Sequence, residues 1–211
     1  MTMKLYTYDP APNPRRLQLF MQYKGISIDT EQINLFEQEQ FSEHYCNINP
    51  TSTVPALALD DGTVLTEVIG MCTYLEELHP EPPLLGSSAV ERALVISWDH
   101  KLFNTVFMSI AEVFRNTHKS FAGRALPGPL ALEQIPELAA RGKLKLDAGW
   151  APLNEHLENN QWLAGDNFTL ADIDLLCALE FAGWIGESIP EDATHLLAWH
   201  QRALQATAAK D

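Results

Sequence analysis

The chain is poor in cysteine, with only Cys46, Cys72 and Cys177 among its 211 residues. Their number is odd, they lie far apart, and no Cys-x-x-Cys spacing occurs. Disulfide frameworks of secreted domains and structural zinc sites both require closely patterned cysteines. We therefore expect reduced and mostly buried thiols.

Basic residues are also scarce: Lys and Arg total 14 against 28 Asp and Glu, which gives a net charge of -14 at pH 7. A surface with this balance repels phosphate backbones and anionic lipids at long range. Nucleic acid and membrane surfaces are therefore not expected partners. A local positive pocket for a small anion remains compatible with the overall charge.

Long apolar runs are missing as well, since no window approaches the ~18 consecutive apolar residues of a membrane span. The first residues, MTMKLYTYDP, lack the pattern of a signal peptide, so the expected location is cytoplasmic. No metal is expected, because the histidines show no ligand spacing. These are His44, His79, His100, His118, His156, His195 and His200.

Strand-like patterns occur only before His79, where they alternate with helical patterns. This order predicts a small mixed sheet covered by helices. We expect a strand at Lys4–Tyr8, then a Pro-rich turn, and then a helix that stops at Gly25. A weak strand follows at Thr30–Asn34, and Ala56–Leu59 and Thr63–Leu65 form a hairpin around Asp60-Asp61-Gly62. The last element is a helix whose buried stripe consists of Val68, Cys72, Leu75 and Leu78.

The rest of the chain has a helical pattern. Residues 80–88 are rich in proline, which cannot continue a helix, so we assign them as a linker between domains of residues 1–79 and 89–211. The helical stretches expected in the second domain are 89–119, 131–158, 170–185 and 192–207, and Leu126–Pro129 separates the first two.

The segment NPTSTVPAL, residues 49–57, places Pro55 at the start of an apolar strand. If the Val54–Pro55 bond is cis, the backbone groups of Val54 turn outward and can pair with an extended peptide. An ordinary edge-strand proline is the alternative. Glu67 precedes a helix whose first amides can bind a carboxylate, while its own side chain can bind an ammonium. Alternatively, Glu67 only complements the helix dipole.

These elements occur in a specific order: strand, turn, helix, NPxxxVPAL, Leu65-Thr66-Glu67, a Pro-rich linker, and helices containing WLAGD (162–166) and FTLADI (168–173). In this order the chain resembles the cytosolic glutathione transferases over essentially its whole length, and Pro12-Asn13 is similar to a bacterial branch of them. The resemblance implies an α/β plus all-α protein, with a thioredoxin-like N-terminal domain that binds glutathione and an all-helical C-terminal domain. It also implies a homodimer and a role in detoxification.

Two further features are assigned to folding. Thr169 and Asp172 have the spacing of a capping box, in which each side chain satisfies a backbone amide at a helix start and typically contributes ~1 kcal/mol. Arg16 matches an arginine that recurs in the family, and we interpret it as structural. Catalysis is therefore sought elsewhere.

By resemblance, the backbone of Val54 beside Pro55 holds the cysteinyl part of glutathione, and Glu67 and Val68 hold its γ-glutamyl end. The family usually has a serine at the position of Val68, and its hydroxyl binds the γ-glutamyl carboxylate. Valine keeps only the backbone amide, and losing a hydrogen bond to a charged group costs ~1.5 to 3 kcal/mol. We expect weaker glutathione binding or a compensating donor, for which Gln40 and Thr53 are the candidates.

The catalytic serine or cysteine of the family aligns with Ala11, which has neither hydroxyl nor thiol. In the bacterial branch the asparagine amide points at the glutathione sulfur, so Asn13 is the preferred activator of the thiol. A hydrogen bond and the start of the helix near Pro14 would both stabilise the thiolate. Tyr8 on the first strand is the alternative activator, and a plain turn or cap role for Asn13 is the other alternative.

The remaining candidates form an apolar pocket for an electrophilic co-substrate: Tyr8, Phe103, Phe107 and Met108. Aromatic residues at helical spacing also form ordinary core, which is the alternative for the last three. The expected function is a glutathione transferase that activates the glutathione thiol for attack on the electrophile. A glutathione-dependent disulfide reductase and a non-catalytic dimeric binding module are the alternatives.

Overall fold

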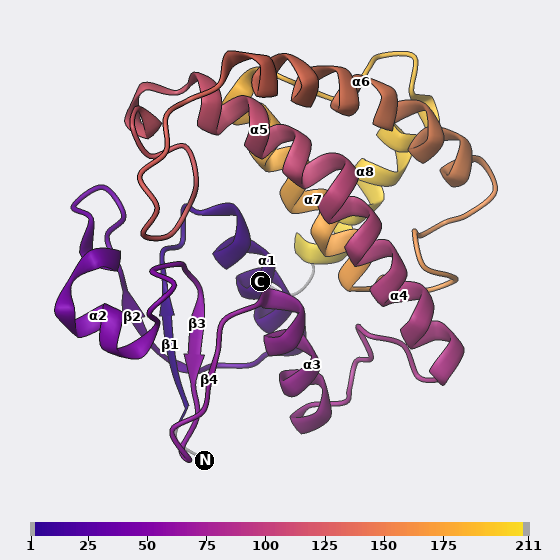
Figure 1. Ribbon diagram of the computed structural model, residues 1–211. Coiled ribbons are helices and arrows are strands. Elements are labelled where there is room, and N and C mark those ends of the chain that lie inside the picture. Colours follow the sequence, from indigo (N-terminus) through magenta and orange to yellow (C-terminus); the bar gives the residue numbers. More distant parts are fainter. Residues whose placement is uncertain (1–2, 209–211) are drawn as a thin grey trace. The chain divides into compact units, whose positions relative to one another are not determined.

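The structure, a computed structural model, describes residues 3–208 (Figure 1). Contacts within the chain divide it into two compact units. The first unit contains the chain up to Pro82 and also Leu126–Ala131, and the second contains Pro83–Ala125 and the chain from Leu132 onward. The return of Leu126–Ala131 to the first unit has no counterpart in the sequence-based boundaries.

The first unit is a mixed four-stranded sheet with the order β2-β1-β3-β4. Strand β1 is parallel to β2 and antiparallel to β3, and β3 and β4 form the expected hairpin. Within this unit, Figure 1 shows α1 and α3 on one side of the sheet and α2 on the other. The elements are β1 (Lys4–Thr7), α1 (Pro12–Lys24), β2 (Asp29–Gln32), a 3-10 turn (Glu39–Phe41), α2 (Glu43–Ile48), β3 (Ala56–Ala58), β4 (Val64–Leu65) and α3 (Val68–Leu78).

Helix α1 ends at Gly25, as the sequence predicts, but begins at Pro12, two residues before the predicted start near Pro14. Pro12 occupies its first turn, where a missing amide proton costs nothing, and Gly25 ends it in the left-handed conformation at φ 66°. The last residue of the helix, Lys24, forms a buried ion pair with Glu76 of α3 at 2.7 Å. Helices α1 and α3 are therefore joined by a charged contact as well as by apolar packing.

Helix α3 corrects one prediction. Val68, Cys72 and Leu75 are buried as expected, but Leu78 is 36% exposed. Leu78 is the last residue of the helix, and the following His79 is exposed too, so the chain leaves the core at this point. The helical period identified the buried face correctly but not the point at which that face leaves the core.

Helix α2 was not predicted, because it spans only six residues. Ser42 caps its start by accepting a hydrogen bond from the amide of Tyr45 at 3.2 Å. The helix buries Tyr45 completely, in a cluster with Tyr6, Ile33 and Ala56. This cluster fills the face of the sheet that α2 covers.

The second unit is helical, as predicted, with two corrections. Its elements are α4 (Ala89–Leu102), a π-helical segment (Phe103–Phe107), α5 (Met108–Thr117), a 3-10 turn (Lys119–Phe121), α6 (Pro136–Glu158), α7 (Leu170–Ala182), a 3-10 turn (Gly183–Ile185) and α8 (Thr194–Ala208). The predicted 89–119 helix is interrupted by the π segment. The predicted 131–158 helix starts only at Pro136, because 126–131 packs on the first unit and proline favours the first helical position.

The segment Leu126–Ala131 approaches the first unit closely at Gly128. This glycine has φ +90°, and a Cβ atom placed on it would lie 3.0 Å from the carbonyl oxygen of Thr51. The left-handed conformation and the short approach both favour glycine at this position. Leu126–Ala131 thus forms a close backbone contact with residues 49–53, which we call the NPTST loop.

A buried carboxylate organises the second unit. Asp172 accepts hydrogen bonds from the amide of Thr169 at 3.0 Å, the amide of Leu163 at 3.1 Å and the indole of Trp199 at 2.8 Å. The capping box predicted for Thr169 and Asp172 is present at the start of α7. Asp172 therefore joins the start of α7, the WLAGD segment and α8.

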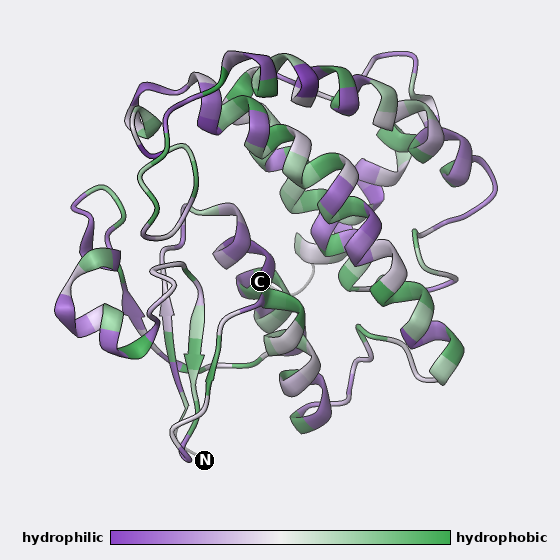
Figure 2. Ribbon diagram, viewed as in Figure 1, coloured by the Kyte–Doolittle hydropathy of each residue, from purple (hydrophilic) through white to green (hydrophobic). Residues whose placement is uncertain are grey.

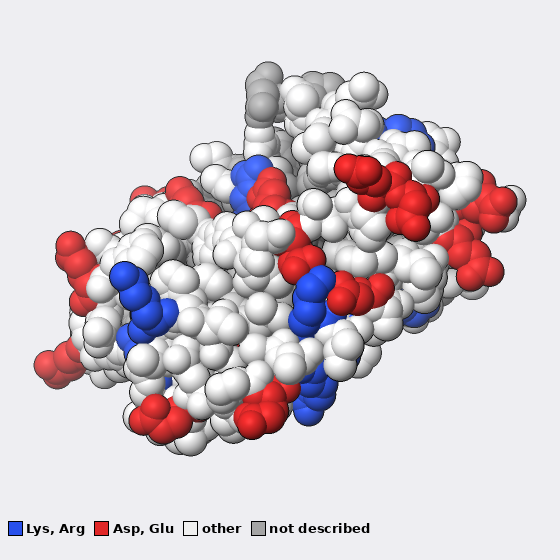
Figure 3. Space-filling model, turned by 90° about the horizontal axis from the view of Figure 1, so that it is seen from above, with Lys and Arg blue, Asp and Glu red and all other residues white. Residues whose placement is uncertain are grey.

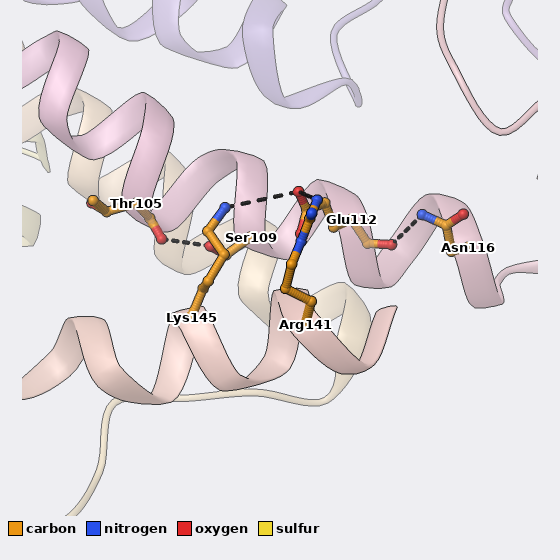
Figure 4. Close-up of polar contacts among 6 residues, drawn as sticks. All are labelled: Thr105, Ser109, Glu112, Asn116, Arg141 and Lys145. Atoms are coloured by element: carbon orange, nitrogen blue, oxygen red, sulfur yellow. Dashed lines mark hydrogen bonds and ion pairs between the residues drawn. The ribbon is translucent and has the colours of Figure 1, made fainter. Parts of the chain in front are cut away.

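Helices α5 and α6 pack closely across Gly142. A Cβ atom at Gly142 would lie 2.6 Å from the carbonyl oxygen of Ser109. Next to this contact, Glu112 of α5 forms ion pairs with Arg141 at 2.7 Å and Lys145 at 3.8 Å, both from α6 (Figure 4). Figure 2 shows that α6 carries both hydrophobic and hydrophilic residues along its length, as expected of a helix with one packed face.

Substituting Gly142 with alanine should destabilise the protein by about 1 to 3 kcal/mol, because the added methyl group meets backbone and forces α5 and α6 apart. A Cβ atom placed on Gly149 of the same helix would meet nothing within 4 Å outside that helix, so Gly149→Ala is the matched control. It should leave stability unchanged or raise it by up to ~1 kcal/mol. Urea unfolding of the two variants measures the difference, and equal effects would contradict the close packing.

Stability should also depend on the charge of Asp172. Burial raises the pKa of this carboxyl to about 6 from 3.8, although its hydrogen bonds from Trp199, Leu163 and Thr169 act in the opposite direction. A folded-state pKa above the unfolded one means that the folded state binds the proton more tightly. The contribution of Asp172 to stability is therefore most favourable below pH 4 and is lost as pH rises through 6.

This dependence can be measured by urea unfolding of the wild type and Asp172→Asn between pH 4 and 7.5. The wild type should lose on the order of 2 to 3 kcal/mol relative to the variant over this range. If Asp172→Asn does not fold, Trp199→Phe replaces it: loss of the indole donor should raise the pKa further and move the transition to higher pH. If the unfolding free energies of wild type and variant changed in parallel with pH, Asp172 would not titrate as stated.

Candidate functional site

The turn between β1 and α1 presents the predicted activator. The amide of Ala11 donates to the carbonyl of Tyr8 at 2.8 Å, which closes the turn. Gln32 at the end of β2 forms two hydrogen bonds with Asp9: its Oε1 accepts from the Asp9 amide at 3.2 Å, and its Nε2 donates to the Asp9 carboxylate at 2.9 Å. The edge strand therefore holds the turn in place.

Asn13 lies in the first turn of α1 and is half-buried. Its Oδ1 atom accepts a hydrogen bond from Nη1 of Arg16 at 3.3 Å. Ala11 precedes the helix and has no side chain that could cap it. Pro12 and Pro14 have no amide proton, so Asn13 supplies the one N–H among the first three residues of α1, and no side-chain cap satisfies it. An uncapped amide at a helix start favours a nearby anion.

The NPTST loop is rigidly bonded around the Thr53 carbonyl. This oxygen accepts from the hydroxyl of Tyr45 at 2.5 Å and from Nδ2 of Asn49 at 2.8 Å. The Thr53 hydroxyl lies 3.0 Å from that of Thr51 and accepts from Asn49 at 3.3 Å. Thr53 is thus occupied in holding the loop, and burial raises the pKa of Tyr45 to about 12, so its hydroxyl remains a donor.

The loop ends at a cis peptide bond between Val54 and Pro55, directly before β3. The sequence left the isomer open. Pro55 is buried, whereas Val54 is half-buried. The residues of β3 pair with β1 on one side and β4 on the other, and Val54 takes part in neither pairing.

Gln40, near this loop, has a side-chain oxygen that lacks a hydrogen-bond donor within residues 3–208. It is 3% exposed, and among the described residues nothing forms a hydrogen bond with its Oε1. Its own carbonyl oxygen lies 3.7 Å from Sγ of Cys46, which also lies 3.6 Å from the Ser52 hydroxyl. A buried amide oxygen without a donor costs free energy unless a ligand supplies that donor.

The start of α3 brings Glu67 and Val68 together. Glu67 is the cap residue, is exposed, and makes no side-chain capping hydrogen bond. Val68 is buried and begins the helix. A carboxylate and a set of helix-start amides therefore lie side by side, which is the pairing expected for a ligand with both an ammonium and a carboxylate group.

The candidate pocket residues fall into both units. Phe103 and Phe107 stack with centroids 6.1 Å apart in the π-helical segment, and Phe107 also contacts Phe181 at 5.7 Å. Phe107 is buried in the core of the second unit, whereas Phe103 and Met108 are half-buried. Tyr8 belongs to the first unit.

Tyr8 contacts an aromatic residue that the sequence analysis missed. Its ring lies 6.1 Å from that of Phe36, which is 80% exposed. The amide of Phe36 donates to Asn34 Oδ1 at 3.1 Å, which fixes the loop after β2. The Asn-x-Phe spacing was the available signal, since asparagine commonly bonds the backbone two residues on.

The cysteines are mostly buried, as predicted. All three cysteines are free; Cys72 and Cys177 are buried and Cys46 is half-buried. Among residues 3–208, no group of three or more His, Cys, Asp or Glu side chains could hold a metal ion. In the same range, no helix is both long and apolar enough to cross a membrane. On the face in Figure 3, the described basic side chains form separate small groups, some of them beside acidic side chains, and no continuous patch.

The sheet order, the covering helices and the helical second unit define a protein with a thioredoxin-like domain followed by an all-α domain. Models of the glutathione S-transferase N-terminal and C-terminal domains match residues 11–78 and 125–206, respectively. The chain belongs to the glutathione S-transferase family.

Individual relatives agree along the full length. Glutathione S-transferase 2 of Saccharomyces cerevisiae is 28% identical over 100% of this chain and 90% of its own. Glutathione S-transferase GstA of Escherichia coli O157:H7 is 27% identical over 99% of this chain and 96% of its own. The crystal structure of a glutathione S-transferase domain-containing protein from Marinobacter aquaeolei is similar with a TM-score of 0.84 and 31% identity, covering 94% of this chain and 96% of that one.

Proposed function

We propose that this protein is a glutathione transferase that binds glutathione on its first unit and promotes attack of the glutathione sulfur on a small electrophile. Membership of the family supports the activity. The observation that carries the assignment of the site is the Glu67 carboxylate, which makes no capping hydrogen bond and lies at the start of α3. This arrangement suits the γ-glutamyl end of glutathione, which carries an ammonium and a carboxylate on one carbon.

The rest of the tripeptide follows from the same placement. Val54 lies outside the strand pairings, so its backbone N–H and C=O are the groups that we assign to the cysteinyl part of glutathione, with Pro55 fixing the strand start. Thr53 shapes this loop through its carbonyl, and its hydroxyl is less suited to act as the compensating donor because Asn49 and Thr51 already bond it. Val68 contributes its backbone amide.

Gln40 is the better candidate for the compensating contact. Its buried Oε1 requires a donor, and the ammonium or an amide of glutathione would supply one. A buried polar group that lacks its partner in the free protein is retained at the expense of stability, which is common at binding sites.

Gln40→Met should therefore separate binding from folding. The substitution preserves the size of the side chain and removes an unsatisfied oxygen, so the unfolding temperature should stay the same or rise. Glutathione affinity, measured by calorimetry, should fall roughly tenfold, which corresponds to ~1.4 kcal/mol. A lower unfolding temperature with unchanged affinity would assign Gln40 to the core alone.

The chemistry that we assign to Asn13 concerns the thiol. A free thiol with a pKa of ~8.5 is only a few per cent thiolate at pH 7. Donation from Asn13 Nδ2 and the positive end of the α1 dipole stabilise the anion, so the thiol proton passes to solvent at lower pH. The thiolate lone pair then forms a bond to the electrophilic carbon, and the leaving group departs with the electrons of the bond that breaks.

Asn13→Ala should leave glutathione binding largely intact, because the two ends of the tripeptide keep their contacts. Loss of a hydrogen bond to a charged group, ~1.5 to 3 kcal/mol, should raise the pKa of the bound thiol by about one to two units. The transfer rate at pH 7 should fall about tenfold or more and recover as pH is raised.

Tyr8→Phe is the control for this measurement, because it removes only a phenolic hydroxyl from the residue beside the same turn. Its pH profile should match that of the wild type. A shifted Tyr8→Phe profile together with an unchanged Asn13→Ala profile would place thiol activation on the strand and overturn the assignment to Asn13.

The co-substrate binds, in this proposal, against Phe103, Phe107 and Met108 of the second unit. Family relatives named as transferases favour this activity over the disulfide reductase and the non-catalytic module. We also propose a homodimer in the cytoplasm, as is typical of the family.

A further inference from the structure

Arg16, the fifth residue of α1, is a buried cation. Arg16 is only 4% exposed, and the first turn of the helix contains no acidic residue. Burying a cation costs free energy unless hydrogen bonds or opposite charges compensate it. The hydrogen bonds of its guanidinium are therefore important to the local structure.

The guanidinium of Arg16 determines which atom of the Asn13 amide faces it. Asn13 and Arg16 are three residues apart and therefore share one face of the helix. A guanidinium has only donors, so the atom at 3.3 Å from Nη1 must be the amide oxygen of Asn13. The amide nitrogen is bonded to the same carbon and is consequently turned away from Arg16.

The amide nitrogen of Asn13 is left available by this arrangement. Within residues 3–208, no group accepts a hydrogen bond from Nδ2 of Asn13. The terminal torsion of asparagine is broad, so without a fixed partner the side chain would present oxygen as well as nitrogen in a given direction. An oxygen facing the glutathione sulfur would repel the thiolate instead of stabilising it.

We propose that Arg16 is a positioning residue for the transfer reaction: it holds Oδ1 of Asn13 so that the Nδ2 protons are directed at the glutathione sulfur. This role goes beyond the structural one expected from the sequence. It rests on the proposed function of Asn13, through which Arg16 acts. Arg15, the neighbouring cation, donates instead to Gln18 Oε1 at 2.9 Å and has no such effect on Asn13.

The test is a double-mutant cycle read by the pH dependence of kcat/KM, with glutathione and 1-chloro-2,4-dinitrobenzene as substrates. The proteins are the wild type, Asn13→Ala, Arg16→Met and the double variant. Arg16→Met should raise the apparent pKa of the thiol by about half to one unit, which lowers the rate at pH 7 by roughly threefold to tenfold. In the Asn13→Ala background, Arg16→Met should produce no further shift.

The matched control is Arg15→Met, which removes the same charge from the adjacent position and should leave the apparent pKa unchanged. If Arg16→Met does not fold, Arg16→Lys replaces it, because lysine keeps the charge but lacks the planar fork that fixes the amide. Arg16→Lys should give a smaller shift, again absent when Asn13 is alanine. A structural role alone would lower the unfolding temperature without moving the pH profile.

The outcomes separate this inference from the proposed function. An equal shift by Arg16→Met with and without Asn13 would mean that the charge acts directly on the sulfur, and would overturn the positioning role. The positioning role would also be overturned if Asn13→Ala shifts the pH profile of kcat/KM and Arg16→Met does not. If Asn13→Ala itself causes no shift, the assignment of Asn13 fails first.

Discussion

The parallel pairing of β1 with β2 is the contact on which the proposed site depends. Lys4 to Thr7 pair in register with Asp29 to Gln32, and the amide of Ile33 extends the ladder to Thr7 at 2.7 Å. Parallel strands require a crossover, which here is α1. Gln32, at the end of β2, then bonds Asp9 in the turn from which α1 departs. The position of Asn13 is therefore set by the sheet and not by a loop alone.

The second unit depends in a comparable way on Asp172. One carboxylate satisfies the start of α7, the amide of Leu163 and the indole of Trp199. Burying a charge is costly unless several donors surround it, and three different segments supply these donors here. Asp172 thereby ties α8 and the WLAGD segment to α7, while Lys24 and Glu76 make the corresponding charged contact between helices of the first unit.

The sequence predicted those elements whose signals are local. The glycine stop of α1, the Asp-Gly hairpin and the capping box at Thr169 and Asp172 each depend on neighbouring residues, and all three are present. It could not predict that Leu126–Ala131 packs on the first unit, because that contact joins Gly128 to Thr51 across a long stretch of chain. The exposure of Leu78 and the late start of α6 likewise depend on what lies nearby in space.

The site shows the same difference between what the sequence suggests and what only the structure reveals. Position and residue type suggested Glu67, Val54 and Asn13, whereas the hydrogen bond between Arg16 and Asn13 and the unsatisfied oxygen of Gln40 required coordinates. The role of Thr53 changed for the same reason, since its partners Tyr45 and Asn49 come from a helix that was not predicted and from the residue that follows it.

The central claim is that the protein lowers the pKa of bound glutathione without a hydroxyl or thiol at position 11. The most direct measurement is a titration of the glutathione thiolate on the enzyme by ultraviolet difference absorbance. The account predicts that bound glutathione ionises at least one pH unit below the free thiol value of ~8.5. Ionisation at the free value, with glutathione demonstrably bound, would contradict it and would leave a protein that holds glutathione without activating it.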